Sequence, residues 1–550
     1  MTESKLSTFD RQDGRLVIAH VLFAFGALLI GGIAGMLQGM VKGGTITLPA
    51  NIGYYELLTA HGVLMALIFT TYFIVGFLYS GISQTLGGRL LPLTRKLGWI
   101  GYLLMSVGTL IGVVVILLGK ASVLYTFYAP MKASPWFYIA LALVVIGSWL
   151  SGFGIFYQYV KWKKTNQGKL SPLFAYMSVI TMLLWQIATL GVAAEVVVQL
   201  IPWSFGWVET INVVLSRTLF WFFGHPLVYF WLLPAYMCWY VIIPKIIGGK
   251  IFSDALARMS FVLFLLFSIP VGFHHQLMEP GISHFWKYLQ VVLTFMVVIP
   301  SLMTAFSLFA TFELNGRSKG TKGLFGWVKV LPWKDVRFFA PFMGMLVFIP
   351  AGAGGLINAS NQMNAVVHNT LWVTGHFHLT VATSVALTFF GIVYWLIPVV
   401  TGRVLTPRLN KLGIIQTITW CVGMLFMSGS MHTVGLLGSP RRTAYNTYDD
   451  HPDAILWMPY HVAMAIGGII LFVAVLLIIY NIVALMRAPK GQTEYPLGEV
   501  SDTSEPTPRF LENWKLWIAL TVILIVVAYT IPIIDQISNP TPGSPGYVTW

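Results

Sequence analysis

The sequence predicts an all-α, polytopic integral membrane protein. Of its 550 residues, 57% are hydrophobic and only 9% are charged, and the mean hydropathy is +0.77. A soluble protein needs far more charge to cover its surface, whereas a chain that crosses a bilayer many times does not. The formal net charge of +14 fits loops that stay on the cytoplasmic side of a membrane, so we expect a lipid bilayer and no nucleic acid as partner.

Apolar stretches long enough to cross a bilayer, about 20 residues each, define the predicted helices. We count thirteen in the sequence. They begin near Leu16, Leu57, Leu97, Trp136, Leu170, Thr218, Leu256, Tyr288, Phe338, Leu371, Leu412, Trp457 and Trp514. The loops between them are mostly short, so we expect one membrane domain over residues 1–550 and no separate soluble domain.

The distribution of lysine and arginine predicts the orientation. With a cytoplasmic N-terminus and alternating sides, most of the 33 cations, from Lys5 to Lys515, fall on the inner side. This asymmetry is the positive-inside pattern, and it predicts an N-terminus in the cytoplasm and a C-terminus outside. The cations left on the outer side are Lys42, Lys120, Lys132, Arg217, Lys287, Arg441 and Arg442.

Several of the twelve histidines lie inside predicted spans, where an ionisable side chain is costly unless it has a partner or a function. They are His61, His225, His274, His275, His376 and His378. A single imidazole in a span can be a neutral residue bonded to a neighbouring helix, and that interpretation stays open for His61 alone. Six of them at spacings suited to metal coordination indicate metal centres.

His376 and His378 are two positions apart, which is about 200° around a helix. They cannot both reach one metal from a regular helix, but they can serve two metals on opposite sides. Imidazole is the usual axial ligand of haem iron, and an apolar bundle accommodates a haem plane. One such haem needs a second axial ligand from another helix, for which His61 is the candidate.

His274 and His275 are adjacent, about 100° apart on a helix, so they converge on one ion only if the backbone opens. Pro270 and Gly272 favour such an opening, because proline removes a helix hydrogen bond. His225 is the candidate for a third nitrogen. Three imidazoles suit copper or zinc and leave a coordination position open for substrate.

Tyr229 follows His225 by four residues and therefore lies on the same face, one turn along. An aromatic residue at this position can simply be part of the core. A phenol beside a metal-binding imidazole can also store a proton and an electron.

The stretches "GHPLVYFWLLP", "VGFHHQ", "IPAGAGGLINAS" and "HNTLWVTGHFHL" together resemble subunit I of the haem–copper oxidases, in that family's order and spacing. The resemblance covers nearly the whole chain. It implies that His61 and His378 are the axial ligands of a low-spin haem, of b type. It implies that His376 binds the iron of a high-spin haem of a or o type.

The resemblance also implies that one copper ion is bound by His225, His274 and His275. Tyr229 is then covalently linked to His225 and supplies an electron and a proton when the O–O bond breaks.

Residues around the same helix indicate the branch of this family. In A-type oxidases a glutamate follows the "HP" pair, where this chain has Leu227, and "GHPLVYFWLLPAYMCWYVIIPK" resembles the B-type branch. That branch has one proton path, rising from the cytoplasm to the tyrosine. The matching hydroxyls are those of Ser253, Ser301, Thr304, Ser307, Tyr240 and Tyr236. Each of the serines and threonines can alternatively bond to the carbonyl one turn earlier in its helix.

Arg441 and Arg442 lie in "LLGSPRRTAY", on the predicted outer side. An arginine fork suits carboxylates, and the resemblance implies that this pair binds haem propionates, together with His368. The alternative is a pair of exposed loop arginines. Asn364 stands where some B-type relatives carry an aspartate that helps to hold pumped protons.

The implied function is that of a terminal respiratory oxidase in the bacterial plasma membrane. It reduces O2 to water and moves protons outward, with electrons from cytochrome c delivered by a subunit II that carries a copper or other electron-entry centre. Quinol is the alternative donor. A nitric oxide reductase would place a glutamate where this chain has Tyr229. A transporter with structural histidines would show inverted repeats, which the sequence does not.

Overall fold

Long apolar helices form most of the chain in the computed structural model, which describes residues 9–502 and 504–548. Lys5 lies outside these residues. Among the described residues, 12 helical segments are long and apolar enough to cross a membrane, with hydropathies of 1.5 to 3.1. Inside a bilayer every backbone N–H and C=O must be paired within the protein, and a helix achieves this within one segment. The predicted all-α membrane bundle is confirmed.

Most crossing segments are single helices, and several contain a π-helical turn. The single helices are α1 (Arg11–Lys42), α4 (Pro92–Leu117), α5 (Pro135–Thr165), α13 (Val336–Ala359), α17 (Pro407–Leu436), α18 (Pro452–Arg487) and α19 (Trp514–Ser538). The composite segments are α2–η1–α3 (Tyr54–Gly62, Val63–Phe69, Thr70–Thr85), α6–η2–α7 (Leu173–Ala194, Glu195–Leu200, Ile201–Ser204), α8–η3–α9 (Val213–Met237, Cys238–Ile242, Ile243–Ile246), α11–α12 (His284–Met296, Val298–Ser318) and α15–η6–α16 (Leu371–Leu379, Thr380–Val385, Ala386–Thr401).

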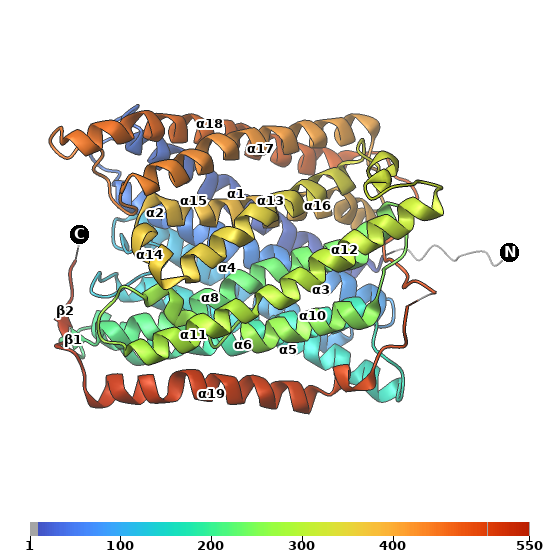
Figure 1. The fold of residues 1–550 in the computed structure, drawn as a ribbon, viewed down its shortest axis with the longest axis horizontal. Helices are drawn as coiled ribbons and strands as arrows, with labels where there is room; N and C mark the ends of the chain where they lie inside the picture. Colours follow the sequence, from blue (N-terminus) through green and yellow to red (C-terminus); the bar gives the residue numbers. More distant parts are fainter. Residues whose placement is uncertain (1–8, 503, 549–550) are drawn as a thin grey trace.

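The predicted span near Leu256 is interrupted. Helix α10 (Asp254–Phe267) has only 14 residues, and after a break at residues 268–271 the chain resumes as the 3₁₀ helix η4 (Gly272–Gln276). Pro270 lies in this break, as expected for a residue without an N–H. Helix α1 begins at one end of the bundle, and α19, the last helix, ends at the opposite end (Figure 1). Opposite ends require an odd number of crossings, so we infer that α10 and η4 together form one interrupted crossing beside the twelve long segments.

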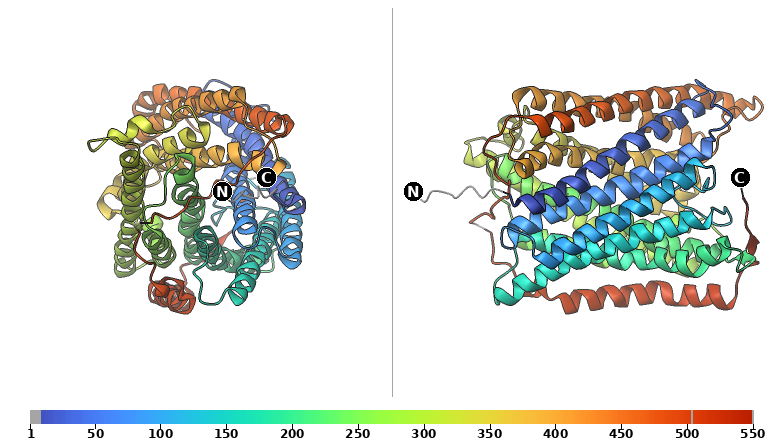
Figure 2. Two further views of the ribbon diagram at one scale, coloured as in Figure 1. Left: turned by 90° about the vertical axis from the view of Figure 1, so that its right-hand side faces the viewer. Right: turned by 180° about the vertical axis from the view of Figure 1, so that it is seen from behind.

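Three segments form the centre of the bundle. The apolar windows of Tyr54–Thr85, Val213–Ile246 and Leu371–Thr401 are 89%, 89% and 94% buried, against 28–67% for the other nine. Viewed along the helices, α19 lies at the periphery (Figure 2). The central segments are those that carry His61, His225 and the pair His376 and His378, so the predicted ligands lie away from lipid.

Glycine pairs allow neighbouring outer helices to approach closely. A Cβ on Gly101 of α4 would lie 2.5 Å from the carbonyl oxygen of Gly147 on α5, and one on Gly147 would lie 2.6 Å from that of Gly101. Helices α17 and α18 make a similar contact, because a Cβ on Gly467 would lie 2.7 Å from the carbonyl oxygen of Gly423. Small residues at such crossings permit close van der Waals packing. This packing holds the helices together within lipid, where the hydrophobic effect does not drive their association.

The remaining elements lie at the two ends of the bundle. They are η5 (Gly326–Val330), α14 (Asn361–Val367), η7 (Arg509–Glu512), and the strands β1 (Thr210–Ile211) and β2 (Ser544–Pro545). The strands pair antiparallel, with Thr210 opposite Pro545.

A buried ionic network fastens η7 to the inner end of the bundle. The Arg258 guanidinium donates to Asp254 at 2.6 Å and to Glu512 at 3.0 Å, and the Lys163 ammonium lies 2.6 Å from the second oxygen of Glu512. Because η7 follows a segment whose described residues form no helix or strand, this network fixes where the chain enters α19.

Candidate metal centre and cofactor cavity

One cavity of about 700 Å³ lies among the central segments. Its wall contains all six predicted metal-binding histidines, which come from α2, α8, η4 and α15. Tyr229, Arg441, Arg442, His368, Asn364, Ser301 and Leu227 also line it. The structure therefore gathers residues that are more than 300 positions apart in the sequence around one space.

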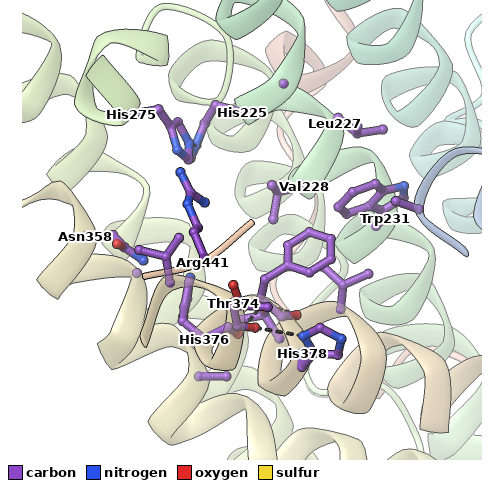
Figure 3. A pocket seen from close by; sticks show the side chains of 18 of the residues that line it. His225, Leu227, Val228, Trp231, His275, Asn358, Thr374, His376, His378 and Arg441 are labelled. Carbon is purple, nitrogen blue, oxygen red and sulfur yellow. Dashed lines mark hydrogen bonds between the residues drawn. The ribbon is translucent and has the colours of Figure 1, made fainter. Parts of the chain in front are cut away.

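Three of the histidines form a metal-binding cluster. One nitrogen each of His225, His274 and His275 lies within 4.8 Å of the other two. The Nδ1 of His225 is 3.2 Å from the Nε2 of His275, and Figure 3 shows these two rings directed toward each other. The cluster forms because α10 ends before it and η4 turns both adjacent histidines toward α8. The predicted opening of the backbone is confirmed.

Neighbouring side chains orient these rings. The Nδ1 of His274 lies 3.0 Å from the Thr294 hydroxyl, which itself donates to the carbonyl of Gln290. That hydroxyl therefore accepts from the Nδ1–H of His274, leaving Nε2 of this ring with a free lone pair. The indole of Trp221 stacks on His275, with ring centroids 3.8 Å apart and planes 6° apart.

His225 lies between the cluster and Tyr229. The ring centroids of His225 and Tyr229 are 4.8 Å apart, and the phenol is 9% exposed. While Nδ1 of His225 faces His275, its Nε2 is buried and has no hydrogen-bond partner among the described residues. A buried, unpaired nitrogen is costly, which indicates that this ring is meant to bind a further group.

His61 and His378 face each other as a parallel pair. Their ring centroids are 6.1 Å apart and their planes differ by 7°. The Nδ1 of His61 lies 2.9 Å from the carbonyl oxygen of Gly31, and that of His378 lies 2.8 Å from the carbonyl oxygen of Thr374. Each Nδ1 must therefore carry the proton and each Nε2 the free lone pair. With metal–nitrogen bonds of about 2 Å, the spacing suits one ion between the rings.

His376 leaves α15 on a different side from His378, as Figure 3 shows. Its ring lies so close to α13 that a Cβ on Gly354 would be 2.6 Å from Nδ1. The indole of Trp372 lies almost parallel to it, with centroids 6.0 Å apart. The prediction that the two histidines serve different sites is therefore supported by their directions.

Two arginines form a cationic part of the cavity wall. Within the described ranges, neither Arg441 nor Arg442 has an ion-pair partner, and the Nη2 of Arg442 is buried without a hydrogen bond. Arg441 donates to the side-chain oxygen of Asn369 at 3.0 Å, and Arg442 lies over the ring of Tyr128 at 4.9 Å. Burial and the charge of Arg442 lower the pKa of Arg441 to about 10. Such a pair requires anions to complete it.

His368 and Asn364 are joined at the same end of the cavity. The Nδ1 of His368 lies 3.1 Å from the side-chain oxygen of Asn364, whose amide nitrogen donates to the carbonyl of Asn358 at 2.7 Å. Burial and the charge of Arg441 lower the pKa of His368. His368 is therefore a neutral hydrogen-bonding group in the cationic region.

The predicted hydroxyls form a partly connected series on α8, η3 and α12. The Tyr236 hydroxyl lies near that of Ser301, and the Tyr240 hydroxyl lies near those of Thr304, Ser307 and Ser260. Only the contact between Tyr240 and Ser260, at 3.3 Å, is a hydrogen bond. Tyr229 lies next in the series.

The alternative role of these hydroxyls is also observed. Ser301 and Thr304 donate to the carbonyls of Val297 and Pro300, at 3.0 and 2.8 Å. Their oxygens can still accept a proton from a neighbour. Ser307 is buried without a partner among the described residues, whereas Ser253 caps α10 by accepting from the N–H of Leu256. The structure thus places Ser307, Thr304 and Ser301 near the two tyrosines without a continuous hydrogen-bonded chain, and it shows no such contact for Ser253.

Four residues of the site were not predicted from the sequence. Trp221 was detectable, because it precedes His225 by one helical turn. Thr294, Tyr128 and Ser260 carry no signal in the sequence, since they reach the site only through tertiary packing.

The fold and the site define an integral membrane protein with a parallel imidazole pair and a three-imidazole metal centre around one cavity. The family model described as "Cytochrome C and Quinol oxidase polypeptide I" matches residues 15–470. Cytochrome c oxidase subunit 1 of Thermus thermophilus is 42% identical over 96% of this chain and 96% of its own. A probable quinol oxidase subunit 1 of Staphylococcus epidermidis is 26% identical over 84% of this chain and 69% of its own length. A solved heme-copper terminal oxidase dimer superimposes with a TM-score of 0.91, at 35% identity, over 98% of this chain and 95% of that chain.

The chain belongs to the haem–copper oxidase family, as its subunit I. It is the catalytic subunit of a terminal oxidase, and the family implies haems and copper. The site fits those groups. The parallel pair leaves two free nitrogens for one iron, the triad supplies three convergent nitrogens for copper, and the unpaired arginines suit haem carboxylates.

Proposed function

We propose that this subunit reduces O2 to water between His376 and the triad of His225, His274 and His275, using electrons from cytochrome c. The observation that carries this proposal is the triad itself, which faces the same cavity as His376 and has Tyr229 beside it. His376 would hold a high-spin haem of a or o type, and the triad one copper ion. His61 and His378 would hold a low-spin haem, of b type.

When bound, the haems and copper carry the electrons and bind oxygen, while the protein sets their geometry and the access of protons. In His61, His378 and His274 the nitrogen that would not face a metal is held by Gly31, Thr374 and Thr294 respectively, so these three rings would not need to reorganise. Tyr229 holds a proton at its hydroxyl beside His225. The unpartnered Nε2 of His225 makes it the group available for the covalent link to Tyr229.

We further propose that protons reach Tyr229 along the single path of the B-type branch. The path enters near Ser253 and continues through Ser307, Thr304, Tyr240, Ser301 and Tyr236. Support comes from the contacts between these hydroxyls and from the identity of Leu227, a cavity residue that cannot carry a proton. Each proton then moved outward works against about 2.3 kcal/mol per 100 mV of membrane potential.

The relatives support a proposal for the electron donor, and the loop charges support one for the membrane. The relative at 42% identity is named a cytochrome c oxidase, whereas the named quinol oxidases reach 26%. A second subunit with a copper or other electron-entry centre would deliver the electrons. The cationic inner loops support a bacterial plasma membrane, with the N-terminus in the cytoplasm and the C-terminus outside. Nitric oxide reduction is disfavoured because Tyr229 occupies the position of the reductases' glutamate.

The variant Tyr229→Phe tests the assigned reaction. It removes the hydroxyl while keeping the ring, so both haem spectra and the copper content should persist while oxygen consumption is abolished. Tyr394→Phe is the matched control, because Tyr394 is also buried and hydrogen-bonded, to Asn481 at 2.8 Å, but does not line the cavity. Normal oxygen consumption by Tyr229→Phe would contradict the role given to this residue.

A further inference from the structure

Three of the cations on the predicted outer side line the cavity that contains the six histidines. They are Arg441, Arg442 and Lys42, the last residue of α1. Two other cations of that side have their own partners. The half-buried Arg217 forms an ion pair with Glu279 at 3.2 Å, and the buried Lys287 donates to the carbonyls of Leu277 and Glu279. Lys42 therefore requires an explanation of its own.

Lys42 is a buried ammonium without a counter-ion. It is only 2% exposed, and its Nζ donates to the carbonyl of Tyr445. An ammonium has three donors, so this one bond leaves two of them unassigned. No carboxylate among the described residues lies within ion-pair distance of Lys42. A buried charge of this kind is costly without a partner of opposite charge, and the described residues supply none.

The position of Lys42 along α1 relates it to His61. Gly31 accepts the hydrogen bond from His61, and a Cβ on Gly35 would lie 2.4 Å from the Nδ1 of His61. Gln38 and Lys42 continue the same face of α1 at spacings of three and four residues. Lys42 thus lies about 10 Å beyond Gly35 along the helix axis, toward the outer end of the cavity.

The residues around Lys42 make this end of the cavity polar. Gln38 lines the cavity beside Lys42, and its side-chain oxygen accepts from the Tyr54 hydroxyl at 3.2 Å. The amide nitrogen of Gln38 is therefore left as a donor. Together with Arg441 and Arg442, Lys42 and the Gln38 amide bring several donors and three positive charges to this end, which is the chemistry that recognises a carboxylate.

We propose that Lys42 binds a propionate carboxylate of the low-spin haem and raises the reduction potential of that haem. The proposal rests on the haem assignment to His61 and His378 made above. A nearby positive charge favours the reduced haem, because reduction adds one negative charge to it. Its removal shifts the one-electron equilibrium about tenfold toward the oxidised form, and a tenfold shift is about 59 mV.

A redox titration of the assembled oxidase tests this directly. Lys42→Met and Lys42→Gln should each lower the midpoint potential of the low-spin haem by about 59 mV, whereas Lys42→Arg should keep the potential of the original protein. The infrared redox-difference bands of haem labelled with ¹³C at the propionate carboxyls should shift in the two neutral variants. If Lys42→Met does not assemble, Lys42→Gln decides, because its amide can still donate to the Tyr445 carbonyl.

Lys287→Met is the matched control. It removes another buried cation of the outer end, one that is 5% exposed and lies outside the cavity wall. In this variant the midpoint potential of the low-spin haem and the propionate infrared bands should equal those of the original protein. The proposal is overturned if the neutral Lys42 variants keep both the potential and the propionate bands, or if Lys287→Met shifts them equally. Absence of a low-spin haem spectrum from the original protein would instead refute the proposed function.

Discussion

Three of the six predicted histidine ligands are each oriented by one nearby hydrogen bond. Gly31 and Thr374 fix the protonated nitrogens of the parallel pair, and Thr294 fixes that of His274. Such outer contacts set the tautomer and the direction of a metal-binding imidazole. The histidines were predictable because their spacing can be read along single helices in the sequence. Thr294 was not predictable, because it lies on α11 and meets η4 only in the folded protein.

Gly354→Ala should disturb one haem site and leave the other intact. Its Cβ would lie 2.6 Å from the Nδ1 of His376, so this ring must move. We expect about 10- to 100-fold lower activity and an altered carbon-monoxide spectrum, with an unchanged low-spin haem spectrum. Gly352→Ala is the control on the same helix, since its Cβ meets Phe348 no closer than 3.8 Å. Identical carbon-monoxide spectra for both variants would contradict the packing described for His376.

At the scale of the element, breaks in regular helices place the site. The break before η4 was predictable from the sequence, because Pro270 and Gly272 both favour a helix break. The π-helical turns η1 and η6 each begin two residues after a proposed axial histidine, η1 after His61 and η6 after His378. Such turns are frequent at functional sites. The sequence contains no proline or glycine pair that predicts them, since they depend on packing among the central segments.

Thr304→Val should slow proton uptake without changing the haem spectra. The valine keeps the shape of the side chain but removes the hydroxyl that lies beside Tyr240. Flow-flash measurements with a pH indicator would follow the uptake. Thr433→Val is the control, because Thr433 makes the same bond to its own helix, to Gly429 at 3.1 Å, but is exposed away from the series. Unchanged uptake in Thr304→Val would remove this residue from the path.

Glu512→Gln should weaken the attachment of η7. Burial raises the pKa of Glu512, but its hydrogen bonds with Lys163 and Ser171 lower it by more, so the pKa lies below the ordinary value. A carboxylate of this kind stabilises the folded state above its unfolded pKa and loses that effect as the pH falls through the folded pKa. We expect a loss of about 1–3 kcal/mol at neutral pH.

The thermal unfolding midpoint of the solubilised protein measures this loss. The difference between the original protein and Glu512→Gln should be full at pH 7 and shrink as the pH falls below the ordinary carboxyl range. Glu494→Gln is the control, because Glu494 is 66% exposed and pairs with Lys245 at 3.1 Å. An exposed pair contributes only about 0–1 kcal/mol. A pH-independent difference for Glu512→Gln would exclude the ionised network as its cause.

At the scale of the molecule, composition and hydropathy predicted the bundle because a bilayer leaves the backbone few alternatives. Twelve of the thirteen predicted crossings are found as long apolar helical segments, and the one predicted near Leu256 is an interrupted helix among the described residues. The closure of one cavity was not predictable, because it depends on how α2, α8, η4 and α15 pack. The cations predicted on the outer side were a usable sign of cavity residues, since Lys42, Arg441 and Arg442 all line the cavity.

The most direct test is the metal content of the purified protein, together with its reduced and carbon-monoxide-bound optical spectra. The account predicts two haem irons and one copper per chain, with carbon monoxide shifting only the haem bound by His376. Three irons and no copper would instead indicate a nitric oxide reductase, and the absence of haem would contradict the account altogether.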